Sequence, residues 1–525
     1  MNPDEGFAMT GELDTIRRLR AWHAGRPLPR GETLNVHVGD DDQVLCISFV
    51  RMGGESLPWG VALGGASESE PQILTVPDPR NRDLVADMMV VVGRRVLEHF
   101  GHPRYVRDHD DGPSIYEFRQ IWVPNRTHLE MLHSLAFAYA RTTRDRPDVE
   151  VLRDFGSLAN CLFVESQRPG QQTVMVASSA LSEVHSFPTS PIREAHLGHQ
   201  LAWFDRAKDR SARLASARKA ERTPVATSLD PDFERKHLVP AVEKWNSYPR
   251  ADRVRKGKAE EAAIAKVLTP ELEHRHRLVT MAIDTLRRDK RRANSGLRDL
   301  VRIGRESFSK LWWDNVLKQI AGDPANRPFW PGLWGDLGPG SAAYAYHARS
   351  AAAAESRQLL VHGDRTLQDE ELLAGHGLRA TVTSVEPRGA TWSARFDFPE
   401  IPSLKVGGSF SIAGSVVNSS KASLKIVDFD LDARTITLEP TWKAARAALG
   451  TWGMARDDQR WVGRTLVLVD DFPPDFTMRL AGKSAKHSAH SFDVLTFFDR
   501  DENRDDNRDE ARDENRDDSG DEFRG

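Results

Sequence analysis

The chain has 525 residues, of which 39 % are hydrophobic and 29 % are charged, so it can bury the cores of about three domains. No run of about 18 apolar residues occurs, which argues against a transmembrane helix, and the first residues lack the apolar core of a secretory signal. Cys46 and Cys161 are the two cysteines, which excludes a disulfide framework, so we expect a cytoplasmic protein without membrane partners.

The formal net charge of −4 is distributed unevenly along the chain. It amounts to about −7 over residues 1–200, +11 over 201–320, −1 over 321–498 and −7 over 499–525. The central segment is therefore a basic module between acidic segments, which is typical of a protein that binds a polyanion, above all nucleic acid. The alternative is a solvated helical surface, because Lys and Arg are good helix formers.

We expect residues 1–190 to form a mixed α/β domain. An opening helix is predicted for 13–22, with Gly25 as its stop. Apolar runs predict strands over 44–51, 59–63, 73–76, 115–123, 161–166 and 173–178. Helices are predicted for 83–100 and, after a capping box of Thr127 and Glu130, up to about residue 141. This alternation favours a mixed sheet covered by helices.

Residues 191–365 are expected to form a helical basic domain. The order Thr269, Pro270, Glu271 predicts a helix start, with the helix running to about residue 292 and broken at 295–296. A second helix is predicted from there to residue 320, and an alanine-rich helix around 350–360.

Residues 366–475 are expected to form a small β-barrel domain with an extension. Five short strands within 377–440 are separated by turn signals, which favours a small closed barrel. The apolar run 467–472 is predicted as a strand outside the barrel. Residues 476–525 contain four-residue repeats such as RDEN and RDDN, so we expect a disordered acidic tail that either competes with DNA for the basic module or only keeps the protein in solution.

The stretch 380–440 resembles the small β-barrel inserted in the motor of Upf-type and Dna-type superfamily 1B helicases. The matching features are a leading TVTSVE strand, a VGGSF entry into a new strand, and the hairpin IVDFDLDARTITLEP. The resemblance implies a barrel that lies against nucleic acid and helps to hold a single strand. It covers about an eighth of the chain.

The ATPase motor of those helicases has no counterpart in the sequence. A phosphate loop has the form GxxxxGK[ST], in which backbone N–H groups and the Lys cradle the nucleotide. The segments GGASES, GHPRYVR and GPGSAAY all lack its Lys-Ser/Thr ending. A motor would therefore be on another polypeptide.

The strongest catalytic pattern is that of a PD-(D/E)xK nuclease, with Asp154 and Glu165 as magnesium ligands and Gln167 in the place of the usual Lys. It requires Glu165 and Gln167 on one face of a strand, and no PD pair precedes Asp154. A ribonuclease-H-like fold for residues 40–200 is a second possibility. Its first strand would carry Cys46 and Ser48 where that class needs an acid, so it would bind without cleaving. Outside the nuclease alternative we expect no metal and no cofactor.

Binding chemistry is better supported, because cations cluster densely in the central segment. Such cations repel one another unless an anion neutralises them, so phosphate contact is a natural role. Two adjacent tryptophans offer surfaces for base stacking. The candidate nucleic-acid-binding residues are Arg253, Arg255, Lys256, Lys258, Arg287, Arg288, Lys290, Arg291, Arg292, Arg298, Arg302, Arg305, Trp312 and Trp313.

The sequence therefore predicts a nucleic-acid-binding accessory subunit that acts with a separate helicase or nuclease, rather than an enzyme. Arginine outnumbers lysine 57 to 16, which is typical of a GC-rich bacterial genome and suggests a DNA-processing or phage-defence assembly. The alternatives are the metal-dependent nuclease and a scaffold that binds only protein. The pattern does not distinguish DNA from RNA or single strands from duplexes.

Overall fold

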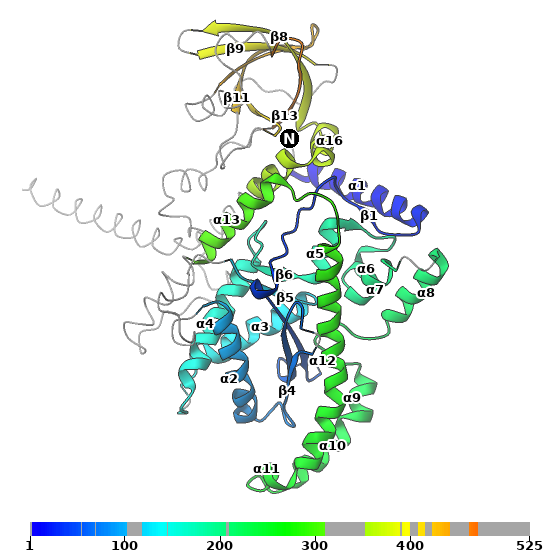
Figure 1. The fold of residues 1–525 in the computed structure, drawn as a ribbon, viewed down its shortest axis with the longest axis vertical. Helices are drawn as coiled ribbons and strands as arrows, with labels where there is room; N and C mark the ends of the chain where they lie inside the picture. Colours follow the sequence, from blue (N-terminus) through cyan, green and yellow to red (C-terminus); the bar gives the residue numbers. More distant parts are fainter. Residues whose placement is uncertain are drawn as a thin grey trace, which may run out of the picture.

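The fold contains one mixed sheet with helices on both faces and one closed barrel, arranged along the long axis of the molecule (Figure 1). The structure is a computed structural model that describes residues 3–53, 55–68, 70–101, 118–143, 145–205, 209–309, 352–388, 391–398, 408–414, 423–440 and 461–470. Trp312, Trp313, the predicted helix beyond residue 309 and the acidic tail 476–525 lie outside these ranges.

Five strands form the mixed sheet in the order β4-β3-β2-β5-β6. They are β2 (Val44–Arg51), β3 (Pro58–Gly65), β4 (Gln72–Thr75), β5 (Gln120–Val123) and β6 (Val174–Val176). Strands β2, β3 and β4 pair antiparallel with one another, whereas β5 runs parallel to both β2 and β6. The first seven residues of β2 and of β3 are all buried, because helices cover both faces and the apolar runs need not alternate. The predicted mixed α/β sheet is confirmed.

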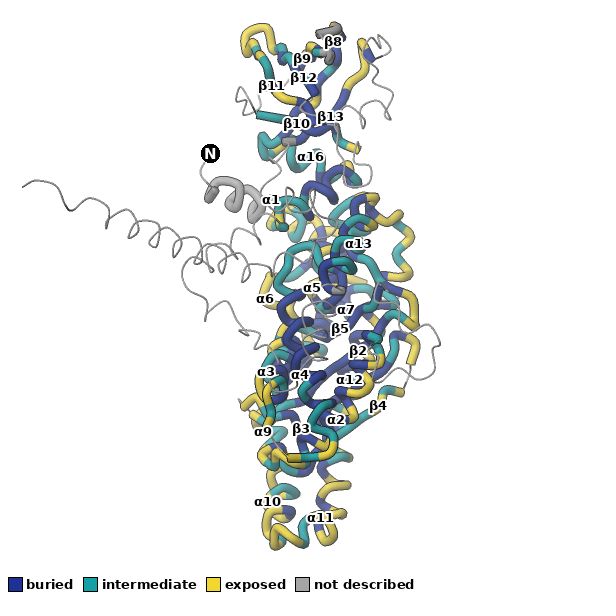
Figure 2. The backbone as a smooth tube through the Cα atoms, turned by 90° about the vertical axis from the view of Figure 1, so that its left-hand side faces the viewer, coloured by how far each residue is buried: buried dark blue, intermediate teal, exposed yellow. Residues whose placement is uncertain are grey.

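One face of the sheet packs on helices α2 (Arg82–His99), α3 (Arg126–Tyr139) and α4 (Val149–Ser166), and the other on α5 (Ala177–Val184) and α12 (Lys258–Arg287). Figure 2 shows the buried residues concentrated in this region, while α10 and α11 project from it at the far end. The second core contains residues of both predicted domains, 1–190 and 191–365, because α12 lies directly on the sheet.

The remaining elements range from two-residue strands to the 22-residue helix α1. Those outside the barrel are α1 (Pro3–Ala24), β1 (Leu28–Pro29), η1 (Asp41–Gln43), β7 (His185–Ser186), α6 (Pro191–Glu194), α7 (Leu197–Ala202), α8 (Arg210–Ala220), α9 (Pro231–His237), α10 (Val239–Ser247), α11 (Arg253–Lys256), α13 (Ser295–Ser309) and α16 (Arg365–Leu373). Residues 352–363 are helical as well. Within the described ranges, no helix combines the length and the apolar character that crossing a membrane would require.

One predicted element and one predicted helix cap in the sheet region are wrong. Residues 161–166 belong to α4 and not to a strand, because a short, fully buried apolar run fits either structure. The helix predicted to begin with Thr127 and Glu130 begins earlier, and its N-cap is Asn125, whose Oδ1 accepts a hydrogen bond from the Thr127 N–H at 3.1 Å.

The helix predicted to start at Pro270 is also wrong, because Pro270 lies inside the 30-residue helix α12. Its ring removes one intrahelical hydrogen bond, which ordinarily ends a helix. Here Ile264, Leu268 and Leu272 continue one buried stripe past the proline, so tertiary packing offsets that loss. The helix ends at Arg287 and not at residue 292.

Six strands form the closed barrel in the order β10-β11-β12-β9-β8-β13. They are β8 (Gly377–Arg388), β9 (Thr391–Asp397), β10 (Ser409–Ile412), β11 (Ser423–Asp430), β12 (Thr435–Pro440) and β13 (Thr465–Asp470). The predicted barrel is confirmed, but the strand expected to lie outside it is β13, which pairs with both β8 and β10. Without β13 those two strands would keep unpaired edges, so β13 completes the closure.

A buried carboxylate joins the barrel region to the rest of the chain. Asp364 is 1 % exposed, and its Oδ2 accepts hydrogen bonds from the N–H and the hydroxyl of Thr33 at 2.7 and 2.6 Å. Its Oδ1 accepts from the N–H groups of Thr366 and Leu367 at 2.9 and 3.2 Å, as the N-cap of α16. Since α16 contacts β8 and β13, this side chain fixes the barrel to the loop before the sheet.

We predict that Asp364→Ala lowers the free energy of unfolding by about 3 kcal/mol, because four hydrogen bonds to a charged acceptor are lost and their donors stay buried. Urea unfolding measures this. The control is Asp369→Ala, which removes a half-exposed ion pair with Arg379 and should cost less than about 1 kcal/mol. Equal losses in the two variants would contradict the assignment.

The carboxyl end of β2 is closed by the chain itself. The segment 225–228 lies against it, and the Arg51 N–H donates to the Thr227 carbonyl at 2.8 Å. The fully buried Arg275 of α12 donates to the carbonyls of Ala226 and Glu271, at 3.0 and 2.8 Å. Ligands of open α/β sheets bind beyond the carboxyl ends of the strands. This closure fills that space at β2 and leaves the space beside β6.

His128 completes the closure from α3. Its Nδ1 accepts a hydrogen bond from the Phe49 N–H at 2.9 Å, and its Nε2 then donates to the Val225 carbonyl at 2.9 Å. Burial lowers the pKa of His128 to about 3, since the charged ring would lose solvation and could no longer accept from Phe49.

We predict that His128 makes the protein less stable in mild acid. In the unfolded chain His128 has its ordinary pKa of 6.5. Below that pH the unfolded chain therefore binds more protons than the folded protein does. The stability that is present above pH 6.5 is lost as the pH falls toward the pKa of His128 in the folded protein. In His128→Gln, the dependence of unfolding free energy on pH should be weaker by about 1.4 kcal/mol per pH unit below about pH 6. Denaturant titrations at several pH values test this, and an unchanged slope would refute it.

Candidate nucleic-acid interface and an adjacent pocket

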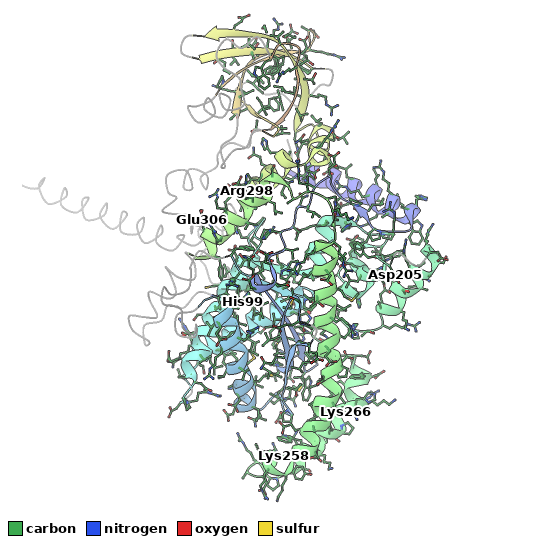
Figure 3. The ribbon with its side chains drawn as sticks, in the orientation of Figure 1. His99, Asp205, Lys258, Lys266, Arg298 and Glu306 are labelled. Carbon is green, nitrogen blue, oxygen red and sulfur yellow. The ribbon has the colours of Figure 1, made fainter. Side chains whose placement is uncertain are left out.

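The predicted cations lie at two separate places and do not form one continuous groove. Arg253, Arg255, Lys256 and Lys258 lie on α11 and the start of α12, whereas the others follow the end of α12. A helix of 30 residues is about 45 Å long, so its two ends are that far apart. Figure 3 shows Lys258 and Arg298 near opposite ends of the helical region.

The chain itself pairs many of these cations with carboxylates. The ion pairs are Arg255 and Lys256 with Asp252 (3.1 and 2.8 Å), Arg287 with Asp41 (2.5 Å), Arg288 with Asp284 (3.3 Å), Arg291 with Asp289 (2.7 Å) and Arg302 with Glu306 (3.3 Å). Arg253 donates to the backbone carbonyls of Tyr248 and Asn246 at 3.0 Å. These contacts reduce the charge that is free to meet a phosphate.

Arg291 illustrates a structural role. Its guanidinium is bidentate to Asp289 and also donates to the Gly31 carbonyl at 2.9 Å. Asp289 further contacts His185 Nε2 at 3.3 Å, and these partners hold the pKa of the Asp289 carboxyl below its usual range, although its burial acts in the opposite direction. Arg291 therefore fixes the turn after α12 to the loop before the sheet.

A cationic strip lies beside this turn. We define it as the exposed Lys290, Arg292 and Arg298 with the half-buried Arg302 and Arg305. Lys290, Arg292 and Arg298 are exposed and make no ion pair with the residues that the structure describes.

Helix α13 presents the last three members of the strip on one face. Arg298, Arg302 and Arg305 are spaced by four and three residues, which places them in one row. Leu297 and Leu300 on the opposite face are buried, whereas Arg298 is exposed and Arg302 and Arg305 are half-buried. Figure 3 shows Arg298 and Glu306 along this helix. A row of cations on a helix anchored by its apolar face can follow a phosphate backbone.

The inner face of α13 packs on the turn before β6. A Cβ at Gly304 would lie 3.0 Å from Arg168 Nη2 and 3.9 Å from the backbone nitrogen of Gln172. This close approach requires glycine or a shift of Arg168. The helix that carries the strip is therefore seated on the turn that leads into the edge strand of the sheet.

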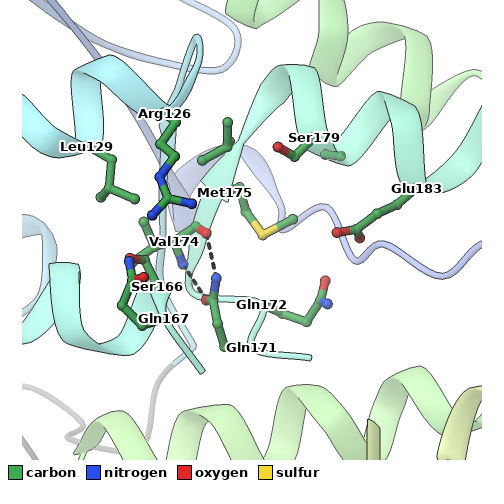
Figure 4. Close-up of a pocket in the computed structure, with 12 residues that line it drawn as sticks. Arg126, Leu129, Ser166, Gln167, Gln171, Gln172, Val174, Met175, Ser179 and Glu183 are labelled. Carbon is green, nitrogen blue, oxygen red and sulfur yellow. Dashed lines mark hydrogen bonds between the residues drawn. The ribbon is translucent and has the colours of Figure 1, made fainter. Parts of the chain in front are cut away.

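A pocket of about 240 Å³ lies along the free edge of β6 (Figure 4). Its walls come from the start of α3, the end of α4, the turn before β6, and α5. The lining residues are Arg126, Leu129, Ser166, Gln167, Gln171, Gln172, Val174, Met175, Val176, Ser179, Ala180 and Glu183.

Gln171 covers part of the unpaired strand edge. Its Nε2 donates to the Val174 carbonyl at 2.7 Å, and its Oε1 accepts from the N–H groups of Thr173 and Val174 at 2.8 Å. The amide thereby replaces a neighbouring strand at Val174. Backbone groups alternate in direction along a parallel ladder, so the N–H of Val176 faces the same side as those of Val174.

The nuclease candidates do not converge. Asp154 and Glu165 are both fully buried on α4, eleven residues and therefore about 16 Å apart along its axis, and Gln167 is the C-cap of that helix. Glu165 is paired with Arg168, whose Nη2 lies 2.6 Å from its Oε1. The strand on which the pattern depends is absent, because these residues are helical. In the described ranges, no group of three or more His, Cys, Asp or Glu side chains is placed to hold a metal ion.

The first strand of the sheet carries no acid at its centre. Cys46 and Ser48 of β2 are each 1 % exposed, and burial raises the pKa of the Cys46 thiol, so the thiol is not activated as a nucleophile. The ribonuclease-H-like interpretation thus has no catalytic carboxylate at this position.

Apart from Gln167, sequence reasoning missed the pocket residues. Arg126 begins α3, with two residues between it and the end of β5, and Glu183 lies near the end of the helix that follows β6. The available signal was the position of polar residues just beyond apolar strands, which is where open sheets bind ligands. Comparisons of the chain with protein-family models, with curated proteins and with solved structures find no match.

Proposed function

We propose that the protein binds nucleic acid as an accessory subunit of a bacterial DNA-processing or phage-defence assembly, together with a separate helicase or nuclease. The observation that supports this best is the cationic strip. Lys290, Arg292 and Arg298 are exposed cations that make no ion pair with the described residues, next to a turn whose other arginines are paired with carboxylates.

The strip suits backbone binding more than sequence reading. Its members are long cationic side chains on a helix and the turn before it, with few neighbouring groups that could read base edges. Phosphate contacts of this kind release counterions, so the affinity should fall steeply with salt. The closed barrel, which resembles a helicase insertion, is the second surface that we propose for a strand or a partner subunit.

A binding role also agrees with the missing catalytic constellation. The described residues hold no cluster of metal-binding side chains, and Asp154 and Glu165 are too far apart to share one ion. We therefore propose binding without cleavage, with no cofactor, and place the chemistry on the partner.

We predict that the triple variant Lys290→Ala, Arg292→Ala, Arg298→Ala binds a fluorescent single-stranded 30-mer at least about tenfold more weakly at 0.15 M salt. Loss of three phosphate contacts should also reduce the slope of log affinity against log salt by about 2. Fluorescence anisotropy across a salt series with DNA and RNA 30-mers measures both.

The matched control is Lys219→Ala, Lys236→Ala, Lys266→Ala, which removes the same charge from three exposed lysines on α8, α9 and the middle of α12. It should change affinity less than about twofold. Equal losses in both triple variants would show a non-specific charge effect and refute the strip. If the unaltered protein binds no nucleic acid at low salt, the protein-binding scaffold is the better description.

A further inference from the structure

The pocket beside β6 combines hydrogen-bond donors, an acceptor and apolar walls within a small volume. Gln172 is 4 % exposed, and its Oε1 accepts from the His37 N–H at 3.0 Å. This bond fixes the orientation of the amide, so the Nε2 group is the one that faces the pocket. Nε2 makes no hydrogen bond with the described residues. An amide donor that opens into a pocket is available to a ligand or to water.

Further groups surround the same space. The Val176 N–H faces it through the alternation of the ladder, and Glu183 supplies a carboxylate from α5. Figure 4 shows Gln172 and Glu183 extending toward the same space, with Met175 beside them. Leu129 and Met175 add apolar surface. A ligand must therefore offer acceptors, at least one donor, and an apolar face.

The size and charge of the pocket limit the kinds of ligand that it can bind. A volume of about 240 Å³ corresponds to roughly eight water molecules, so the ligand has about that many non-hydrogen atoms. Arg126 and Glu183 both line the pocket. Burial raises the pKa of Glu183 to about 7, so above that pH its carboxylate favours an amino group beside it. A flat heterocycle with ring acceptors and an exocyclic amino group meets these conditions.

We infer that this pocket binds a single nucleobase that carries an exocyclic amino group, with the amino group on Glu183 and ring acceptors on Gln172 Nε2 and the Val176 N–H. The base belongs either to a free nucleotide or to an unpaired position of a bound strand. A base from a bound strand rests on the proposed function. The helix that carries the cationic strip packs at Gly304 on the turn that forms one wall of the pocket, so a strand bound there would lie near it.

Cytidine and uridine monophosphates are matched probes, because they differ chiefly in the amino group. Isothermal titration should show saturable binding of cytidine monophosphate, about tenfold tighter than that of uridine monophosphate. Glu183→Gln should remove this preference, because the amide no longer favours a donor. If neither cytidine, adenosine nor guanosine monophosphate binds saturably, and no base of an oligonucleotide reaches the pocket in the cross-linking below, the inference is overturned.

Ser179→Trp fills the pocket from an exposed position on α5, and should weaken binding of cytidine monophosphate at least about tenfold. The control Ser211→Trp places the same side chain on an exposed position of the outer helix α8 and should leave it unchanged. Thermal melting of both variants checks that they fold. Equal weakening in the two variants, or none in either, refutes the pocket as the site.

The oligonucleotide experiment separates the two sources and the two proposals. Cross-linking of a 4-thiouridine-containing 30-mer, with cytidine next to each thiouridine, should label Met175 or Leu129 if the base comes from a bound strand. Binding of nucleotides without such labelling supports the free-nucleotide source. If the 30-mer binds in a salt-dependent way but neither labels the pocket nor is accompanied by nucleotide binding, this inference is overturned and the proposed function stands. If nucleotides bind in the pocket but no strand binds, this inference stands and the proposed function is overturned.

Discussion

The packing of α12 on the sheet is the interaction on which the other features depend. Its buried stripe, with Ile264, Leu268, Val279 and Ile283, covers one sheet face over most of the 30-residue helix. Burial of apolar side chains on this scale outweighs the hydrogen bond lost at Pro270. The same packing places Arg275 against the loop that closes the carboxyl end of β2. It also holds the two groups of cations at opposite ends of helix α12.

Charge pairing then decides which cations remain for a ligand. Arg287 and Arg291 lie in the densest run of positive charge in the sequence, yet both are drawn into contacts with the loop before the sheet, through Asp41 and the Gly31 carbonyl. Contacts of this kind fix geometry and offset part of the charge. The neighbours Lys290 and Arg292 point away from these partners and stay exposed, so alternate residues of one turn have different roles.

The sequence predicted the elements whose signal is local. The apolar runs of β2 and β3, the stripe of α2 and the short strands of the barrel all matched. Residues 161–166 failed because a buried apolar run carries no period, and β13 failed because its pairing with β8 joins residues more than eighty positions apart. The partnership of Arg287 with Asp41 spans 246 residues and has no trace in either local segment. The pocket was missed for the same reason, because its walls come from four separate elements.

The edge of β6, with which no described strand pairs, explains why a pocket remains beside this sheet. At β2 the carboxyl end is filled by residues 225–228, and the opposite edge strand β4 contacts α12. Among the described residues, the Gln171 side chain alone takes the place of a further strand at β6, where it bonds to the backbone of Val174 and not to that of Val176. The Gln171 amide occupies the place where another strand would pair with β6. It leaves the Val176 N–H as a backbone donor for a small partner. The geometry thus favours recognition of a compact group over addition of a peptide strand.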